Sequence, residues 1–380
     1  MNNIAVMAEQ NGSICEKNKK ARNGKIEFLR FLFAVIIVFH HSRSFLGDEI
    51  SPFLGGSLAV EFFFFVSGYL MMASIDKKNK LGKPQYIGRE TIQYVGKKWV
   101  SVLPESIISW IIAFCIMCPL EGRDFESTVF RFIDGIWEPI FITMTGLGQR
   151  GMNGVVWYIS AMLICMMILY PLLRKYPDVT LHILIPLISL CIFGCFFRNS
   201  GSVRNPTKWL GWTYRGVLRA FAEIGIGCWL FYLSRAISKN NYTRKGRLVI
   251  STVENIMYIM VIYFMYIMGA NKHDYFFVAL MAIAVALTFS GAGIDAELFN
   301  NKIVMWLGRF SVPLYFSHIF WGDALNYFVP LTFRIRYSMA IYFALSCATA
   351  LIVMKLSSEV RKSGPIVLKK IREYLIKDAI

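Results

Sequence analysis

The residues best suited to catalysis lie in the first apolar segment of the chain. Arg30 and His41 are eleven residues apart in that segment. Because an α-helix turns about 100° per residue, eleven steps make close to three turns, so both side chains lie on one face, roughly 16 Å apart along the axis. His40 points about 100° away from that face. An imidazole can take up a proton near neutral pH, so His41 is a candidate general base.

A carboxylate in the second apolar segment lies at a similar depth. Glu61 is about eight residues from the start of that segment, and the loop between the two segments is short. We therefore expect two antiparallel, neighbouring helices. A buried carboxylate beside an imidazole sets its tautomer and stabilises the imidazolium. Glu61 is a candidate for that support of His41, and equally a candidate for the structural partner of a buried donor.

The composition indicates which elements hold these residues. The chain of 380 residues is 56% hydrophobic and only 17% charged, which is too little charge for the surface of a soluble protein. A membrane span needs about 20 mainly apolar residues. Such segments lie near residues 27–46, 53–75, 99–118, 154–173, 181–197, 212–234, 248–268, 274–292, 303–321 and 337–357. The predicted fold class is all-α, a polytopic transmembrane helix bundle of about ten spans.

The net charge of +17 is distributed unevenly between the spans. Lys and Arg cluster in alternate connecting segments, about 27 of the 41 on one side and about 11 on the other. The positive-inside rule assigns the richer side to the cytoplasm, predicts that both termini are cytoplasmic, and argues against nucleic acid as the partner. The predicted regions are a basic cytoplasmic tail over 1–25, a transmembrane domain over 26–357, and a second basic cytoplasmic tail over 358–380.

The eight cysteines are scattered, and most of them lie within apolar segments. Cys115 and Cys118 form a C-x-x-C pair, but no second pair or histidine cluster accompanies it. We therefore expect neither a disulfide framework nor a metal site.

Several motifs together resemble the membrane-bound acyltransferase-3 family, and they cover nearly all of the apolar chain. The pairing of Arg30-x10-His41 with an aromatic-rich Ser-Gly-Tyr-Leu motif is fairly specific, whereas the later motifs are weak singly. The matching stretches are Arg30 to His41, Val60-Glu61-Phe62-Phe63-Phe64, Ser67-Gly68-Tyr69-Leu70, Trp157-Tyr158-Ile159-Ser160, and Leu307-Gly308-Arg309-Phe310-Ser311 with Tyr315 and His318. The resemblance implies a bundle of about ten spans that moves acyl groups from cytoplasmic acyl-CoA to acceptors on or beyond the membrane.

The resemblance also implies roles for individual residues. His41 would be the general base that deprotonates an acceptor hydroxyl, with a covalent acyl-histidine as the alternative. The cations expected to bind the phosphates of coenzyme A are Arg30, Lys97 and Lys98. Without the resemblance, Arg30 could also be a side chain that extends to the lipid headgroups. The residues expected on the acceptor side or along a pore are Ser67, Trp157, Tyr158, Tyr315 and His318, of which the last two also fit an aromatic belt.

One departure from the family pattern concerns the donor. The family usually has Arg-x-x-Arg two residues before Tyr-Pro at the start of the third span, where this chain has Lys97-Lys98-Trp99-Val100-Ser101-Val102-Leu103-Pro104. Lys98 stands for the first arginine and Ser101 for the second. A lysine still offers a positive charge to a phosphate, whereas a serine offers none. Arg89 and Lys97 are the candidates to compensate.

The predicted function is transfer of an acetyl group from acetyl-CoA to a hydroxyl of a cell-envelope saccharide or similar acceptor. The protein would be a multi-pass plasma-membrane enzyme with acyl-CoA as co-substrate, no tightly bound cofactor and no metal. One alternative is a transporter or flippase for a lipid-linked saccharide or small solute, with Arg30, Glu61 and His41 as gating or proton-coupling groups. The mostly unbroken spans and the lack of an internal repeat count against it. Another is a membrane sensor or anchor with a separate catalytic partner.

Overall fold

A computed structural model describes residues 22–48, 50–147, 151–295, 297–328 and 331–377. Within these ranges the chain is helical, and the only β-type pairing is an isolated bridge between Trp209 and Tyr214. The predicted all-α class is therefore confirmed. Of the predicted N-terminal tail, residues 1–21 lie outside the described part of the chain.

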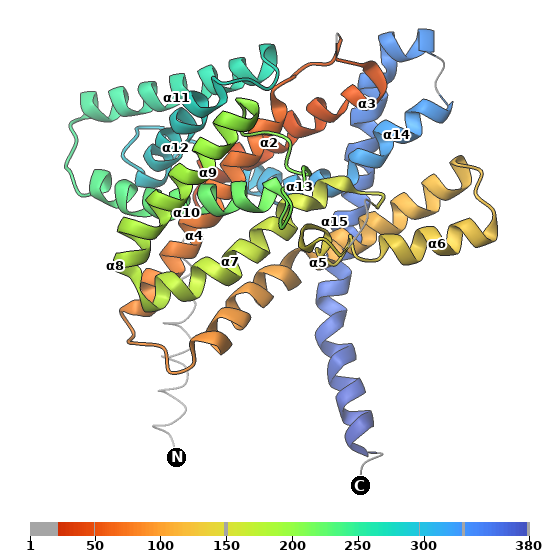
Figure 1. The fold of residues 1–380 in the computed structure, drawn as a ribbon, viewed down its shortest axis with the longest axis horizontal. Coiled ribbons are helices and arrows are strands. Elements are labelled where there is room, and N and C mark those ends of the chain that lie inside the picture. Colours follow the sequence, from red (N-terminus) through yellow and green to blue (C-terminus); the bar gives the residue numbers. More distant parts are fainter. Residues whose placement is uncertain (1–21, 49, 148–150, 296, 329–330, 378–380) are drawn as a thin grey trace.

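Each of the ten predicted apolar segments falls mainly on a helix (Figure 1). The longer helices are α2 (Gly24–His41), α4 (Ala59–Asn79), α5 (Ile87–Leu120), α6 (Phe125–Gly135), α7 (Trp157–Lys175), α9 (Ile185–Ser200), α10 (Arg215–Ser238), α11 (Arg244–Ile267), α12 (Asp274–Ser290), α13 (Lys302–Ser317), α14 (Ile319–Phe328) and α15 (Leu331–Lys377). The short ones are α3 (Arg43–Leu46), η1 (Gly56–Leu58), η2 (Thr143–Thr145), η3 (Gly154–Val156), α8 (Pro177–Val179) and the π-helical η4 (Thr180–Leu184).

Eight helical stretches in the described part of the chain are long and apolar enough to cross a membrane. The predicted span 303–321 is not one straight helix, because α13 and α14 meet at a bend of 49° next to His318. The apolar helix α12 is shorter than the eight, with 17 residues. The protein is therefore a multi-pass helical membrane protein, and the count of ten spans stays a prediction.

The last helix extends beyond the predicted final span. α15 has 47 residues, and its apolar stretch covers Tyr337–Ser363. Its C-terminal part projects from the bundle in Figure 1 (blue). The predicted tail over 358–380 therefore begins within a continuous helix.

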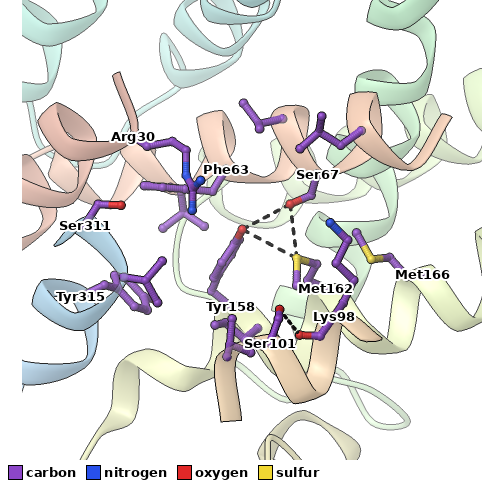
Figure 2. A pocket seen from close by; sticks show the side chains of 16 residues that line it. Arg30, Phe63, Ser67, Lys98, Ser101, Tyr158, Met162, Met166, Ser311 and Tyr315 are labelled. Atoms are coloured by element: carbon purple, nitrogen blue, oxygen red, sulfur yellow. Dashed lines mark hydrogen bonds between the residues drawn. The ribbon is translucent and has the colours of Figure 1, made fainter. Parts of the chain in front are cut away.

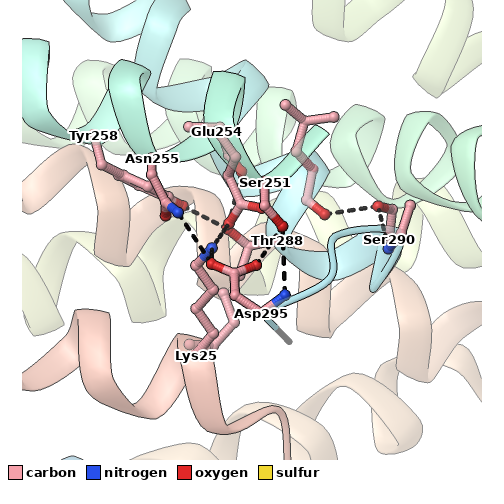
Figure 3. A network of polar contacts seen from close by, with 12 residues as sticks. Lys25, Ser251, Glu254, Asn255, Tyr258, Thr288, Ser290 and Asp295 are labelled. Atoms are coloured by element: carbon pink, nitrogen blue, oxygen red, sulfur yellow. Dashed lines mark hydrogen bonds and ion pairs between the residues drawn. The ribbon is translucent and has the colours of Figure 1, made fainter. Parts of the chain in front are cut away.

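The start of α2 is held in a buried polar network (Figure 3). Lys25, predicted as part of a basic tail, is buried and pairs with Glu254 at 2.8 Å and with Asp295 at 2.7 Å. Burial raises the pKa of Asp295, but hydrogen bonds from Lys25, Ser251 and Asn255 bring it down to about 2. The tail prediction is wrong for Lys25, because two carboxylates distant in sequence hold its ammonium inside the protein.

Among the described helices, α4 and α10 have the most extensive mutual packing, and they pack along each other. Their crossing is made possible by two glycines, since a Cβ added at Gly68 would lie 2.9 Å from the Cα of Gly227, and the reverse distance is also 2.9 Å. Small residues allow helix backbones to approach closely in membranes. The glycine of the Ser67-Gly68-Tyr69-Leu70 motif therefore sets the position of α4.

We expect Gly68→Val to lower the stability of the purified protein by about 1–3 kcal/mol, because the added side chain overpacks this crossing. Thermal unfolding in detergent, followed by size-exclusion chromatography, measures the effect. Gly194→Val on α9 is the matched control, since a Cβ at Gly194 meets nothing within 4 Å. Equal melting temperatures for the two variants would contradict the role of the crossing.

Candidate functional site

Two cavities open along one face of α2. The first, which we call the Arg30 cavity, is shown in Figure 2; its polar and aromatic lining is Arg30, Phe63, Ser67, Lys98, Ser101, Tyr158, Ser311 and Tyr315. The second, the His41 cavity, has a volume of about 710 Å³; its lining includes His40, His41, Arg43, Asp48, Ser57, Trp157, Arg204, Asn205 and Tyr315. Val60 and Tyr315 line both cavities. The two cavities therefore meet at these two side chains.

The helix α2 positions Arg30 and His41 at opposite ends of this arrangement. It is unbroken from Gly24 to His41, and its first turn is capped by Asn23, whose side chain accepts a hydrogen bond from the backbone N–H of Ile26. Eleven helical steps separate the two side chains by roughly 16 Å along the axis. Each side chain lines one of the adjoining cavities, as the spacing predicts.

The imidazole of His41 is oriented by the backbone. Its Nδ1 lies 2.9 Å from the carbonyl oxygen of Ile37. A carbonyl only accepts hydrogen bonds, so Nδ1 must hold the hydrogen and the lone pair of the neutral ring is on Nε2. His318, which is fully buried, has its Nε2 3.4 Å from the same Nδ1 and its own Nδ1 3.3 Å from the carbonyl of Leu314. His318 therefore lies against His41.

The neighbouring histidine has a different contact. The Nδ1 of His40 lies 2.8 Å from the carbonyl oxygen of Phe53, which ties the end of α2 to the loop that leads into α4. His40 also lines the His41 cavity. This hydrogen bond gives His40 a structural contact that His41 does not share.

The predicted pairing of Glu61 with His41 is wrong. Glu61 is fully buried, and its Oε2 accepts a hydrogen bond at 3.0 Å from Nε of Arg219, while its Oε1 pairs with the same guanidinium. The side chain is directed at α10, which packs along α4, and the tautomer of His41 is held by a backbone carbonyl instead. The alternative of Glu61 as the partner of a buried donor agrees with this geometry.

Arg219 lies at the centre of a charged cluster behind the His41 cavity. Its Nε is 3.2 Å from Glu223, and the side chains of Glu61, Arg219 and Glu223 are all completely buried. The guanidinium lies 5.6 Å from the ring centroid of Trp157 and donates to the carbonyl of Ser57 at 3.3 Å. Both of these partners line the His41 cavity. The cluster therefore supports one wall of that cavity.

The remaining predicted site residues are divided between the two cavities. Ser67 and Tyr158 line the Arg30 cavity, with their hydroxyls 3.5 Å apart, whereas Trp157 lines the His41 cavity. The ring of Tyr315 lies 6.1 Å from that of Tyr158 and 6.0 Å from that of His318, and its hydroxyl donates to the carbonyl of Val155 at 2.5 Å. Tyr315 therefore connects the two groups of residues.

Of the predicted donor-binding cations, two line the same cavity. Arg30 and Lys98 both line the Arg30 cavity, and Glu27, on the preceding turn of α2, lies 3.4 Å from Arg30. Lys97 and Arg89 are exposed and line neither cavity. The structure therefore does not bring either of these residues to Arg30 as a replacement for the family's second arginine.

A buried carboxylate lies in the segment that links α6 to α7. Glu138 is 1% exposed and accepts a hydrogen bond at 2.9 Å from the backbone N–H of Asn153. Asn153 in turn donates to the carbonyl of Phe316, in the site helix α13, at 2.7 Å. Burial raises the pKa of Glu138 to about 7, although backbone hydrogen bonds oppose the rise.

This raised pKa predicts a pH-dependent stability. The folded protein binds the Glu138 proton more tightly than the unfolded chain, so stability should fall as pH rises from about 4.5 to about 7. We expect wild type to lose a few degrees of melting temperature between pH 5 and pH 8 that Glu138→Gln does not lose. Asp134→Asn is the control, because Asp134 is exposed on α6. If the melting temperature of Glu138→Gln fell with pH as steeply as that of wild type, Glu138 would not be the group responsible.

The chain matches a known family over most of its length. A model of the acyltransferase-3 family, described as an acyltransferase domain, matches residues 23–357. No curated protein and no solved structure matches the chain.

Proposed function

Because this chain belongs to the acyltransferase-3 family and is a membrane acyltransferase, we propose that it transfers an acetyl group from cytoplasmic acetyl-CoA to a hydroxyl of a cell-envelope saccharide or similar acceptor. The observation that supports this best is the pair of adjoining cavities along α2. One holds the cations Arg30 and Lys98, and the other holds His41 with its Nε2 lone pair.

The donor would enter from the cytoplasmic side, where the positive-inside rule places the start of α2. The phosphates of coenzyme A would bind near Arg30 and Lys98, because a cation beside a phosphate makes a charge-assisted hydrogen bond. The extended pantetheine arm is on the order of 15–20 Å long, comparable with the axial rise of roughly 16 Å between Arg30 and His41. The thioester would then pass Tyr315 and reach the His41 cavity.

The chemical step follows from the tautomer of His41. Nε2 takes the proton of the acceptor hydroxyl while the hydroxyl oxygen attacks the thioester carbonyl carbon. The C–S bond of the resulting tetrahedral intermediate then breaks, the ester is released, and the imidazolium returns its proton to the coenzyme A sulfur. The carbonyl of Ile37, 2.9 Å from Nδ1, keeps the ring in place and stabilises its charged form.

The acceptor would occupy the His41 cavity. Its lining combines two large aromatic side chains, Trp157 and Tyr315, with polar side chains that include Asp48, Arg204 and Asn205. Ligand sites typically pair apolar surface with a few polar groups that fix orientation. This combination fits a saccharide, whose hydroxyls need hydrogen-bond partners and whose ring face is apolar.

The experiment that tests the proposal measures transfer of labelled acetyl from acetyl-CoA to cell-envelope material. Membranes from cells that express the chain are compared with membranes from the same cells without it. We expect acetylated saccharide only when the chain is present. Movement of an unmodified saccharide across the membrane, with no label transferred, would instead support the transporter alternative.

A further inference from the structure

A third cavity adjoins the Arg30 cavity at the predicted cytoplasmic end of α2. Its volume is about 560 Å³, and it shares Arg30, Ser101, Val102 and Val312 with the Arg30 cavity. We call it the basic cleft after the five cations in its lining, which are Arg22, Arg30, Arg309, Arg361 and Lys362. Arg30 therefore stands between the two cavities.

The basic cleft has an excess of positive charge. Its lining contains a single acidic residue, Glu105, which pairs with Arg361. Of the other cations, Arg22 and Arg30 share Glu27, and Lys362 pairs with Glu359 at 2.8 Å. Among the residues that the structure describes, these five cations thus face three carboxylates, an excess of two positive charges.

Arg309 has no carboxylate partner among the residues that the structure describes. Its Nε donates only to the backbone carbonyl of Met305, at 3.3 Å, and its side chain is exposed. An arginine presents five N–H donors in a fork that matches the oxygens of a phosphate. Most of the donors of Arg309 are therefore available to an anion in the cleft.

Arg361 lies beside Ser101, the residue that stands where the family usually has its second arginine. Its guanidinium, which reaches from α15, donates to the backbone carbonyl of Ser101 at 2.7 Å. Ser101 itself has no charge, and its hydroxyl is bonded to the carbonyl of Lys98 at 2.7 Å. A positive charge is thus present beside Ser101, supplied by a different helix.

We propose that Arg309 and Arg361 bind the phosphates at the nucleotide end of the acyl-CoA donor, in place of the arginine that Ser101 replaces. This rests on the proposed function. The pantetheine arm would occupy the Arg30 cavity, the nucleotide would occupy the basic cleft, and Arg30 would lie at the junction. The phosphate of an anionic lipid headgroup has the same chemistry, and the experiment separates the two ligands.

The test compares two donors with the protein in nanodiscs. Acetyl-CoA has the phosphates, whereas S-acetylpantetheine has none. We expect Arg309→Ala, and Arg361→Ala combined with Glu105→Gln, to raise KM for acetyl-CoA about 10-fold or more, as for loss of a charged hydrogen bond. KM for S-acetylpantetheine and kcat should stay unchanged. Arg361→Lys should recover part of the loss, and Lys245→Ala, an exposed cation elsewhere, should behave as wild type.

Three results would overturn the proposal. The first is an unchanged KM for acetyl-CoA in both variants. The second is an equal rise in KM for both donors, which would mean that the substitutions disturb the site rather than the phosphate contact. In the third, the activity of the variants no longer depends on the anionic lipid content of the nanodisc, and neither KM changes. This result would assign the cleft to lipid headgroups. Wild type that transfers acetyl from neither donor would refute the proposed function instead, and calorimetric binding of coenzyme A would still test the cleft.

Discussion

Replacing His41 with alanine is expected to lower acyl transfer by about 10²–10⁴-fold, the usual cost of losing a general base. The backbone hydrogen bond from Nδ1 to Ile37 leaves Nε2 as the basic atom in the cavity. Among the residues that the structure describes, the one side chain of another helix within hydrogen-bonding distance of the His41 ring is His318, at 3.4 Å. The amount of folded protein should therefore change little. The measurement is the rate of acetyl transfer at matched protein levels.

Two further variants make this result specific. His41→Asn keeps an N–H that can donate to the carbonyl of Ile37 but has no basic nitrogen, so it should be as inactive as the alanine variant. His182→Ala is the control, because His182 lies in η4, away from both cavities. Transfer by His41→Asn at the wild-type rate would mean that the residue positions the site and does not accept the proton. Labelling of His41 by acetyl-CoA without acceptor would favour the acyl-histidine route.

Arg219→Met should cost about 3–5 kcal/mol of stability, because it leaves two buried carboxylates without their cation. Glu61 and Glu223 are completely buried, and both bond to the same guanidinium. The loss should appear as a lower melting temperature and as aggregation during purification in detergent.

The control for Arg219→Met removes the unpaired charges as well. Arg219→Met combined with Glu61→Gln and Glu223→Gln should recover most of the stability, since no buried charge then remains. If the single variant were as stable as wild type, the cluster would have no part in holding α4 against α10. If the triple variant were no better than the single one, packing of the arginine stem would be the larger contribution.

The common face of Arg30 and His41 could be predicted because both lie on one continuous helix. Within α2, helical periodicity alone decides which residues share a face. The same holds for the existence of the apolar helices, since each needs only its own sequence to be long and apolar. Predictions of this kind depend on local sequence.

The partner of Glu61 could not be predicted in that way. It depends on the rotation of α4 about its own axis and on which distant helix packs against it, and Arg219 is 158 residues further along the chain. Lys25 illustrates the same limit, since Asp295, 270 residues away, draws it into the interior. A signal was nevertheless present, because Arg219 and Glu223 are ionisable residues four apart in an apolar span, where such residues are costly and usually paired.

The bend beside His318 is also a tertiary feature. The apolar segment 303–321 has the composition of one span, and Pro313, its strongest helix breaker, lies inside α13 rather than at the bend. The change of direction brings His318 against His41. Packing between helices, and not local propensity, therefore decides this part of the site.

The wall shared by the two cavities has a consequence for the cell. A passage that lets a thioester cross most of the bilayer would also conduct protons and ions if it stood open, and would short-circuit the membrane potential. Tyr315 and Val60 are the side chains at which the cavities meet, and the hydrogen bond from Tyr315 to Val155 fixes the ring there. Electrical insulation would then depend on these two side chains, so a smaller residue in place of Tyr315 would let ions leak across the membrane even where acyl transfer survived.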